Sequence, residues 1–257
     1  MAEPAPHLSV QLRHRIGALQ IDVDFKLTAR WTILFGPSGS GKTTILRAVA
    51  GLLHPDQARI VGAVPVTPGH ESPFTLVDTR AGIFVPPHKR VVRLAPQQPS
   101  LFPHMTVLEN VRYGMSFSSP DAGKIRAGKT AVQNLLSELF IADLTDKRPH
   151  QLSGGEAQRV NLARAFATGG GRLLLLDEPF TGLDSRLKDE LISRLSEDNA
   201  VSKQTQILSV THDIVEAFQL DAEVIKLSEG RIVQQGPVAT VLAEERARLL
   251  EQLSPSE

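Results

Sequence analysis

The sequence has no cysteine among its 257 residues. Disulfide bonds, thiolate metal sites and cysteine nucleophiles are therefore excluded. Aromatic residues are scarce as well, at 5% of the chain, and none precedes Phe25. The earliest part of the chain therefore offers no aromatic ring on which a planar ligand could stack.

The chain also lacks an excess of either charge and any long apolar run. Lysine plus arginine and aspartate plus glutamate number 28 each. A general nucleic-acid binder usually has a basic excess, so no nucleic-acid partner is expected. Met1 to His7 contain no apolar signal-peptide core. The most apolar windows, such as Leu173 to Leu176, are much shorter than the roughly 20 residues that span a bilayer. Work at a membrane would therefore require a partner that holds the chain there.

Short apolar runs and helical patterns alternate along the chain. Residues 8–35 alternate apolar and polar side chains, which predicts antiparallel strands with one face in water. Residues 54–90 are rich in proline and glycine, and we expect strands and loops there. The remaining alternation predicts a largely parallel core sheet covered by helices. The predicted strands are 31–35, 91–94, 172–176 and 206–210, the predicted helices are 43–51, 155–168, 186–199, 213–218 and 238–253, and a hairpin is predicted over 222–235.

Residues 99–151 have a different pattern, because helical spacing replaces the alternation of strand and helix. Four apolar residues there are spaced for one face of a helix, namely Leu135, Leu136, Leu139 and Phe140. We therefore predict that this stretch forms a helical subdomain inserted into the α/β fold.

A glycine-rich segment follows the apolar run 31–35. Residues 36–43 match the P-loop pattern G-x-x-x-x-G-K-[ST]. Its glycines let the backbone curl round a phosphate, and the N–H groups of the loop and of the following helix stabilise the anion. Lys42 is expected to reach the β- and γ-phosphates, and the Thr43 hydroxyl to ligate Mg²⁺. The predicted nucleotide-binding residues in this segment are Gly36, Pro37, Ser38, Gly39, Ser40, Gly41, Lys42, Thr43 and Thr44.

Two acidic residues follow another buried strand. Asp177 and Glu178 come directly after an apolar run, which delivers their carboxylates to the C-terminal edge of the sheet, where the phosphate loop also lies. Asp177 is expected to hold Mg²⁺, directly or through water, and Glu178 to orient or deprotonate the attacking water. His212, after a further apolar strand, is placed to hydrogen-bond the γ-phosphate. A solvated acidic turn and a capping histidine are the plain structural alternatives.

Two consecutive glycines lie at the start of the helix predicted from residue 155. Ser153 and Glu156 have the spacing of a capping box, so one explanation is a well-formed helix start. Gly154 and Gly155 exceed what a cap requires, and they leave bare N–H groups that an anion could approach. Because residues 36–43 already supply one phosphate cradle, this second helix end predicts contact with the nucleotide of a second chain.

Taken together, these motifs resemble the ATPase subunits of ATP-binding-cassette (ABC) transporters over essentially the whole chain. The resemblance implies one ABC ATPase domain over 1–257, in the α/β class: a P-loop NTPase (RecA-like) core with a mostly parallel sheet, an N-terminal antiparallel β subdomain and an inserted helical subdomain. The matching elements are the Walker A loop at Gly36–Thr43, the Q-loop at Gln97, the LSGGE signature at Leu152–Glu156 with Gln158 and Arg159, Walker B with the catalytic glutamate at Leu173–Glu178, the D-loop at Thr181–Asp184 and the switch histidine at His212.

The resemblance further implies how the domain is divided and how ATP is bound. The catalytic core is expected at residues 1–98 and 156–257, and the helical subdomain at 99–155. Members of the family bind ATP and Mg²⁺ between two chains, so a homodimer or a pairing with a related subunit is expected. The chain-to-chain contacts to ATP are then expected from Ser153, Gly154, Gly155 and Asp184, the metal contacts from Thr43, Gln97 and Asp177, and the catalytic contacts from Lys42, Glu178 and His212.

The family resemblance also implies partners at a membrane. The chain is expected to lie peripherally on the cytoplasmic side of the cell membrane and to contact integral permease subunits through residues 97–111. A periplasmic or extracellular solute-binding protein would take part indirectly. The apolar residues Leu101 and Phe102 in this region have two explanations, either as core of the helical subdomain or as a groove for a short helix of the permease.

Within the family, the chain most resembles the molybdate-type importer ATPases. The resemblance lies in residues 86–90, 97–103 and 110–115. It implies uptake of molybdate or a related oxyanion. Many such ATPases carry an additional C-terminal β-domain, which is not expected here because the sequence ends at Glu257.

The region that usually stacks adenine departs from the family pattern. In place of an aromatic residue it contains Arg13, His14 and Arg15. Adenine would then rest on a cation, on an imidazole or on aliphatic carbons, and the selectivity for the nucleotide would be loose. The sequence leaves these three alternatives open.

Other functional classes are less consistent with the motifs. A soluble ABC ATPase acting on nucleic acid usually carries coiled-coil insertions or tandem cassettes, and neither is present. An exporter cassette is disfavoured by residues 101–107, which resemble importer ATPases. A P-loop kinase outside the family would have no use for the signature at 152–156.

Overall fold

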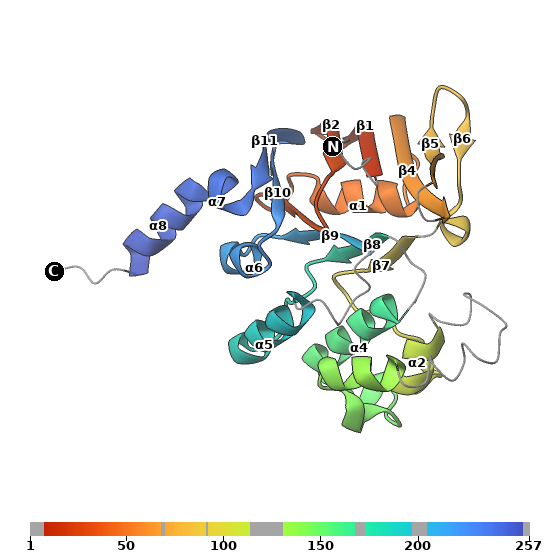
Figure 1. Cartoon of the computed structure of the whole chain (residues 1–257), viewed down its shortest axis with the longest axis vertical. Coiled ribbons are helices and arrows are strands. Elements are labelled where there is room, and N and C mark those ends of the chain that lie inside the picture. The colour runs from red at the N-terminus through yellow and green to blue at the C-terminus, as the bar shows by residue number, and fades with distance from the viewer. Residues whose placement is uncertain are drawn as a thin grey trace. The chain divides into compact units, whose positions relative to one another are not determined.

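The computed structural model describes residues 8–67, 70–90, 92–113, 131–167, 173–196 and 205–253 (Figure 1). The chain divides into two compact units. The first contains the residues up to Arg90 and those from Gln206 onward, and the second contains the residues from Val91 to Thr205.

The first unit is built on a mixed sheet with the strand order β6-β5-β4-β1-β2-β11-β10-β3-β9. Every adjacent pair from β6 to β2 is antiparallel, whereas β2–β11, β10–β3 and β3–β9 are parallel. The strands are β1 (Leu8–Ile16), β2 (Leu19–Leu27), β3 (Trp31–Phe35), β4 (Gln57–Thr67), β5 (His70–Asp78), β6 (Ile83–Phe84), β9 (Gln206–Thr211), β10 (Glu223–Ser228) and β11 (Arg231–Pro237).

The β1–β2 hairpin confirms the predicted antiparallel strands. Alternate residues of both strands, such as Val10 in β1 and Val23 in β2, are buried, and their neighbours face water. Strands β3 and β9 are buried at every position, as expected for central strands of a sheet. The hairpin predicted over residues 222–235 is also present, because β10 and β11 pair around Glu229 and Gly230.

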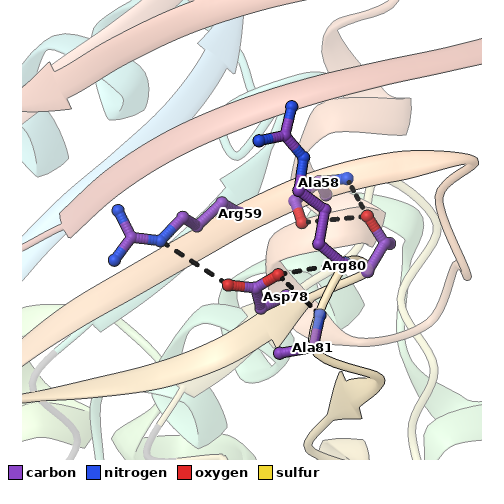
Figure 2. Close-up of polar contacts among 6 residues, drawn as sticks. Ala58, Arg59, Asp78, Arg80 and Ala81 are labelled. Carbon is purple, nitrogen blue, oxygen red and sulfur yellow. Dashed lines mark hydrogen bonds and ion pairs between the residues drawn. The ribbon is translucent and has the colours of Figure 1, made fainter.

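Polar contacts close the turn after β5, as Figure 2 shows. The Asp78 carboxylate accepts hydrogen bonds from the backbone N–H groups of Arg80 and Ala81 and lies 3.7 Å from Arg59 Nε on β4. The Thr79 hydroxyl accepts from the Ala58 N–H at 3.0 Å. An aspartate that caps its own turn in this way is a frequent turn former, and the strands and loops predicted for residues 54–90 are present as β4, β5, β6 and their connections.

Helices of the first unit follow the predictions at two places and differ at a third. Helix α1 (Lys42–Ala50) ends at Gly51, and α6 (Ile214–Gln219) begins after Asp213, as predicted. The single helix predicted over 238–253 is wrong, because the chain forms α7 (Val238–Val241) and α8 (Ala243–Leu253). Leu242 breaks the helix with φ −108° and ψ 23°, and its side chain is fully buried. The break keeps α7 on the core while α8 remains mostly exposed.

The second unit contains two parallel strands and several helices. Strands β7 (Val92–Ala95) and β8 (Leu173–Asp177) pair in parallel. The elements around them are α2 (Val107–Tyr113), a helix over residues 131–138, α4 (Gly154–Phe166), α5 (Ser185–Ser196) and short 3₁₀ turns at Ala142–Leu144 and Pro149–Gln151.

The helical character predicted for 99–151 is confirmed within the described residues, with one correction. Leu135, Leu136 and Leu139 are buried, but Phe140 lies beyond the helix and has a positive φ of 54°. The hydrogen bond from Ile141 N–H to Leu136 O turns the chain there, so the helix ends before Phe140. Some residues of the predicted elements and motifs lie outside the described residues, namely 91, 114, 115, 168, 172 and 197–199.

None of the helices within the described residues is long and apolar enough to cross a membrane.

Candidate functional site

The loop between β3 and α1 requires glycine at two positions. Gly36 has φ 155°, and a Cβ there would collide with the backbone carbonyl oxygen of Leu227 in β10. Gly41 has φ 101°, and a Cβ there would lie 2.9 Å from Ile21 Cδ1. Other side chains would therefore both strain the backbone and push against neighbours. The glycines fix a loop that curves tightly between strand and helix.

Lys42 lies at the centre of this loop. Its ammonium donates to Gly36 O at 2.8 Å and to Pro37 O at 2.7 Å, and it lies 3.4 Å from Ser40 Oγ. The side chain is buried, whereas the loop tip at Pro37, Ser38 and Gly39 is exposed. A positive charge is thus held beneath an open loop, as the binding of a phosphate anion requires.

The N-terminus of α1 has no side-chain cap. Its N-cap residue is Gly41, in the left-handed conformation, which has no side chain that could accept a hydrogen bond from the first turn. Thr43 and Thr44 lie in that turn and are partly accessible. The partial positive charge of the helix end therefore adds to the charge of Lys42, and the loop as a whole fits a polyphosphate.

His212 follows the strand next to the phosphate loop. Phe35 of β3 pairs with Thr211 of β9, so Gly36 and His212 both come directly after paired residues of parallel strands. The His212 side chain is exposed, and Thr211 beneath it is buried. Within the first unit, the structure therefore brings the predicted switch histidine and the phosphate loop to the same edge of the sheet.

Glu216 supports this turn, and the sequence analysis did not identify it. The Thr211 hydroxyl donates to Glu216 Oε2 at 2.6 Å and accepts from the Asp213 N–H at 3.0 Å. Glu216 is buried, and Asp213 caps α6 by accepting from the Val215 N–H. The sequence signal that could have identified Glu216 is its position on a short predicted helix, four residues after the histidine.

In the second unit, the two predicted acids lie at the end of β8, one as its last residue and one directly after it. Asp177 is the last residue of the strand and is buried. Glu178 follows with a positive φ of 47°, and its Oε2 accepts from Gln97 Nε2 at 2.9 Å and from the Thr181 hydroxyl at 3.2 Å. Gln97 and Glu178 are therefore brought together, 81 residues apart in sequence, and Thr181 is a further contact that the sequence analysis did not assign.

Gln158 of α4 supports the backbone that carries Glu178. Its amide donates to Pro179 O at 3.1 Å, and the side chain is buried. In the sequence, Gln158 appeared only as part of the LSGGE-x-QR pattern. The structure shows that one role of this residue is to hold the segment after β8.

Helix α4 begins with a complete capping box. The Ser153 hydroxyl accepts from the Glu156 N–H at 3.2 Å, and Glu156 Oε2 accepts from the Ser153 N–H at 2.7 Å. The hydrogen bond that the Ser153 N–H donates to the carboxylate makes the largest contribution to lowering the pKa of the Glu156 carboxyl, with smaller contributions from Lys147 and Arg159. Apart from its chain neighbours and the backbone of its own helix, no described residue comes within 4 Å of the position where a Cβ of Gly154 would be. The cap explains Ser153 and Glu156 but does not explain Gly154.

Asp184 begins α5. Its Oδ1 accepts from the Leu187 N–H at 3.0 Å, and its carbonyl accepts from the Lys188 N–H at 2.9 Å. This is an N-cap, so the structure gives Asp184 a role within its own chain.

The region predicted to contact a permease is organised by a buried asparagine. Asn110 Oδ1 accepts from the Phe102 N–H at 2.8 Å, and its Nδ2 donates to Thr106 O at 3.0 Å. Leu101 and Phe102 are only half-buried, and the Phe102 ring packs against Tyr113 at 4.5 Å between centroids. Neither residue is fully in the core, so both remain accessible to a partner.

The residues fit Mg²⁺ only together with a polyphosphate. Among the described residues, no group of three or more histidine, aspartate or glutamate side chains could hold a metal ion on its own. Mg²⁺ typically takes one or two protein carboxylates or hydroxyls and completes its shell with phosphate oxygens and water. Each unit offers single oxygen ligands of this kind, namely the Thr43 hydroxyl in the first unit and the Asp177 carboxylate and Gln97 amide oxygen in the second.

Comparison with known proteins agrees with this geometry. The model of the ABC transporter family matches residues 20–181. The molybdenum import ATP-binding protein ModC of Mesorhizobium japonicum is 40% identical over 236 residues, which are 91% of this chain and 59% of that protein. The molybdate/tungstate import ATP-binding protein WtpC of Archaeoglobus fulgidus is 34% identical over 96% of this chain and 94% of that protein.

Solved structures share the fold. A dimeric ATP-binding cassette in a post-hydrolysis state, bound to ADP and Pi, matches with a TM-score of 0.69 and 25% identity over 90% of this chain and 98% of that one. A bacterial Atm1-family ABC exporter with ATP bound matches with a TM-score of 0.72 and 24% identity over 100% of this chain and 43% of that one. The chain spans about three fifths of the ModC relative cited above. The α/β fold with its phosphate loop is that of P-loop NTPases, and the chain belongs to the ABC transporter family.

Proposed function

We propose that the chain binds and hydrolyses ATP and thereby energises the uptake of molybdate or a related oxyanion through a membrane permease. The observation that carries this proposal is the loop 36–43, which holds the Lys42 ammonium beneath exposed backbone at an uncapped helix end. The solute is proposed from relatives that are named molybdenum and molybdate/tungstate import proteins.

The first unit would hold the phosphates of ATP. Lys42 would exchange its hydrogen bonds to Gly36 O and Pro37 O for bonds to phosphate oxygens, because the charged acceptors bind the ammonium more strongly. His212, at the same edge of the sheet, would donate to the terminal phosphate. Binding of this kind places the γ-phosphorus in a positively charged environment that favours attack by water.

The second unit would supply the hydrolytic groups. Glu178 would orient a water molecule and accept its proton while the water oxygen bonds to the γ-phosphorus and the bond to ADP breaks. Gln97 and Thr181 both donate to the Glu178 carboxylate and fix its orientation. Mg²⁺, held by Thr43, Asp177 and Gln97, would supply charge neutralisation at the phosphates.

A pair of chains would complete the site. Gly154 lacks a side chain at the beginning of α4 for no reason within its own chain, since neither its φ nor the surrounding space requires glycine. Residues 153–155 would therefore approach the nucleotide of a second chain, and Asp184 would extend the contact. The dimeric ADP-bound cassette of the same fold supports this arrangement.

The permease would contact residues 97–111, where Leu101 and Phe102 remain accessible. The chain would then lie on the cytoplasmic side of the cell membrane, held by that partner, with a solute-binding protein acting on the other side. The division of the chain into a catalytic core at 1–98 and 156–257 and a helical subdomain at 99–155 belongs to this proposal.

The substitution Glu178→Gln tests the proposed chemistry. We expect ATP affinity to be unchanged and the release of inorganic phosphate to fall at least about 100-fold, because the amide cannot accept the proton from water. The variant should also accumulate as an ATP-bound dimer in light scattering. Glu190→Gln on the exposed face of α5 is the matched control. Unchanged phosphate release in the Glu178 variant would contradict the assignment.

The transport role needs a separate measurement. Vesicles that contain the chain with its membrane permease should accumulate radiolabelled molybdate only when ATP is present. Capture of a nucleic acid instead of a permease in a pull-down from cell extract would overturn the proposed partner.

A further inference from the structure

Gln97 and Glu178 lie just beyond the strands that lead to them. Strands β7 and β8 pair as far as Ala95 and Leu176, so each of the two residues comes two positions after the last pair. Pro96, directly after β7, has no N–H group and cannot extend the pairing. The positions of the Gln97 and Glu178 side chains therefore depend on contacts other than strand pairing.

The backbone of Glu178 has a conformation that a glutamate rarely adopts. Its φ is 47°, in the left-handed region, and Pro179 follows it directly. A residue in this conformation costs free energy and persists only where the surrounding structure holds it. The segment after β8 therefore needs support from outside the strand.

Helix α4 supplies this support through Gln158. The Gln158 Nε2 donates to Pro179 O at 3.1 Å and lies 3.5 Å from Glu178 O. The Oε1 of the same amide is buried and has no hydrogen-bond partner among the described residues. Because an unpaired buried acceptor costs free energy, the contribution of this side chain lies in the hydrogen bond that it donates.

Asn161, on the next turn of α4, makes the matching contact to the segment before Gln97. Its Nδ2 donates to Pro96 O at 3.1 Å, and the residue is only 1% exposed. Its Oδ1 lies 3.4 Å from Arg164 Nη2. A guanidinium has donors only, so Arg164 fixes which end of the Asn161 amide faces the proline carbonyl. The sequence analysis did not identify Asn161.

Gln158 and Asn161 are three residues apart and therefore lie on the same face of α4. One holds the carbonyl of the proline after Glu178, and the other holds the carbonyl of the proline before Gln97. We infer that Gln158 and Asn161 form an amide clamp that positions the Glu178 carboxylate and the Gln97 amide for hydrolysis. The inference rests on the proposed function, and both members of the clamp are positioning residues, because they act through the backbone of the hydrolytic pair.

Loss of either amide should slow hydrolysis without weakening the binding of ATP. The phosphates are proposed to bind residues 36–43 in the first unit, whereas the clamp and the hydrolytic pair belong to the second. A displacement of a catalytic group by about 1 Å can lower the rate about 100-fold. Asn161→Leu and Gln158→Met each remove the donor. Either change should lower kcat about tenfold and leave the KM for ATP within about twofold.

A double-mutant cycle tests whether Asn161 acts through Gln97. Gln97→Ala removes the side chain that Asn161 is inferred to position. In that background, Asn161→Leu should change kcat by less than about twofold. Steady-state release of inorganic phosphate by the purified chain measures kcat and KM for the single and double variants. Asn161→Ala is the second variant for the cycle, in case leucine at this position prevents folding, and the same results are expected.

Val132→Ala is the matched control for stability. Val132 is buried in the helix over residues 131–138 of the same unit, and its truncation removes apolar contacts but no hydrogen-bond donor. The variant should lower the urea midpoint and leave kcat and KM unchanged. The clamp variants should differ from it through their loss of kcat.

Three outcomes would overturn the clamp. One is an unchanged kcat in Gln158→Met or in both Asn161 variants. Another is a further tenfold loss of kcat from Asn161→Leu in the Gln97→Ala background, because Asn161 would then act independently of Gln97. The third is a loss of kcat in Val132→Ala as large as in the clamp variants, since activity would then merely follow stability. Failure of the proposed function is distinguishable, because the unmodified chain would then release no phosphate from ATP.

Discussion

Glycine lies at the start of both α1, as the N-cap Gly41, and α4, as the first helical residue Gly154, but the two N-termini are built in opposite ways. The start of α1 has no side-chain cap, whereas the start of α4 is closed by the reciprocal hydrogen bonds of Ser153 and Glu156. The start of a helix attracts anions, and where no side chain caps it an anion can accept hydrogen bonds from its N–H groups. At a capped end, side chains of the chain itself already accept hydrogen bonds from the first turn.

The glycines at the two helix starts also differ, because the fold requires only one of them. Gly41 is required by its own chain, because its φ is 101° and Ile21 occupies the space of a Cβ. Gly154 has no positive φ, and nothing in the part of the chain that the structure describes occupies the space of its Cβ. A glycine that the backbone conformation or the surrounding space requires indicates how a loop is shaped. A glycine that neither of these requires indicates that another molecule approaches the chain at that point. Substitutions of Gly41 and Gly154 distinguish these two explanations.

The largest effect is expected for Gly41→Ala. The change strains the left-handed residue and pushes against Ile21, so the free energy of unfolding should fall by about 2 kcal/mol. Because the loop would shift, ATP affinity should fall at least 100-fold. Urea denaturation and calorimetry measure the two quantities. Normal ATP binding by this variant would mean that the loop geometry does not control phosphate binding.

A smaller but more selective effect is expected for Gly154→Ala. Alanine fits the helical backbone and the open space, so the free energy of unfolding should be unchanged or rise by about 0.5 kcal/mol. The added methyl group would obstruct the nucleotide of the second chain, so phosphate release should fall about 10- to 100-fold at saturating ATP. Full hydrolytic activity, measured by phosphate release, would remove the argument for a contact in trans at this glycine.

The smallest effect concerns the charge of the α4 cap. The pKa of Glu156 is lowered in the folded chain, so its contribution to stability is present above the unfolded value of about 4.5 and is lost as the pH falls through the folded pKa. Glu156→Gln keeps the hydrogen bonds of the cap but removes this pH dependence. At pH 7 it should cost about 0.5 kcal/mol, because water screens the exposed carboxylate.

Urea midpoints of both proteins at pH 7 and pH 4 provide the measurement. The difference in urea midpoint between the unmodified chain and the variant should become smaller as the pH falls. A difference that stays constant or widens would show that the carboxylate does not stabilise the cap through its charge.

Much of the fold followed from local patterns, and the failures have local causes. Strands β3, β8 and β9 were predicted as short apolar runs, and all three are buried throughout. The helix over 238–253 was wrong because its spacing continues through Leu242, and only the backbone angles of that residue, φ −108° and ψ 23°, reveal the break. Phe140 was misplaced for the same reason, since periodicity does not show where a backbone turns.

The candidate site was predicted less evenly. The phosphate loop could be identified residue by residue, because its chemistry depends on contiguous backbone and one lysine. Glu216 was not identified, and the contact of Thr181 with Glu178 was not predicted, because no sequence spacing specifies these hydrogen bonds on its own.

The sequence by itself determined the chemistry available to this protein, namely a phosphate loop, two acids after a buried strand, and a histidine after another. These depend on residue identity and on neighbours in the chain, which the sequence states directly. Only the tertiary structure decided which groups are already engaged. Glu178 already accepts hydrogen bonds from Gln97 and Thr181, and Glu156 closes the cap of α4, whereas the start of α1 has no side-chain cap, because packing sets contacts that composition does not contain.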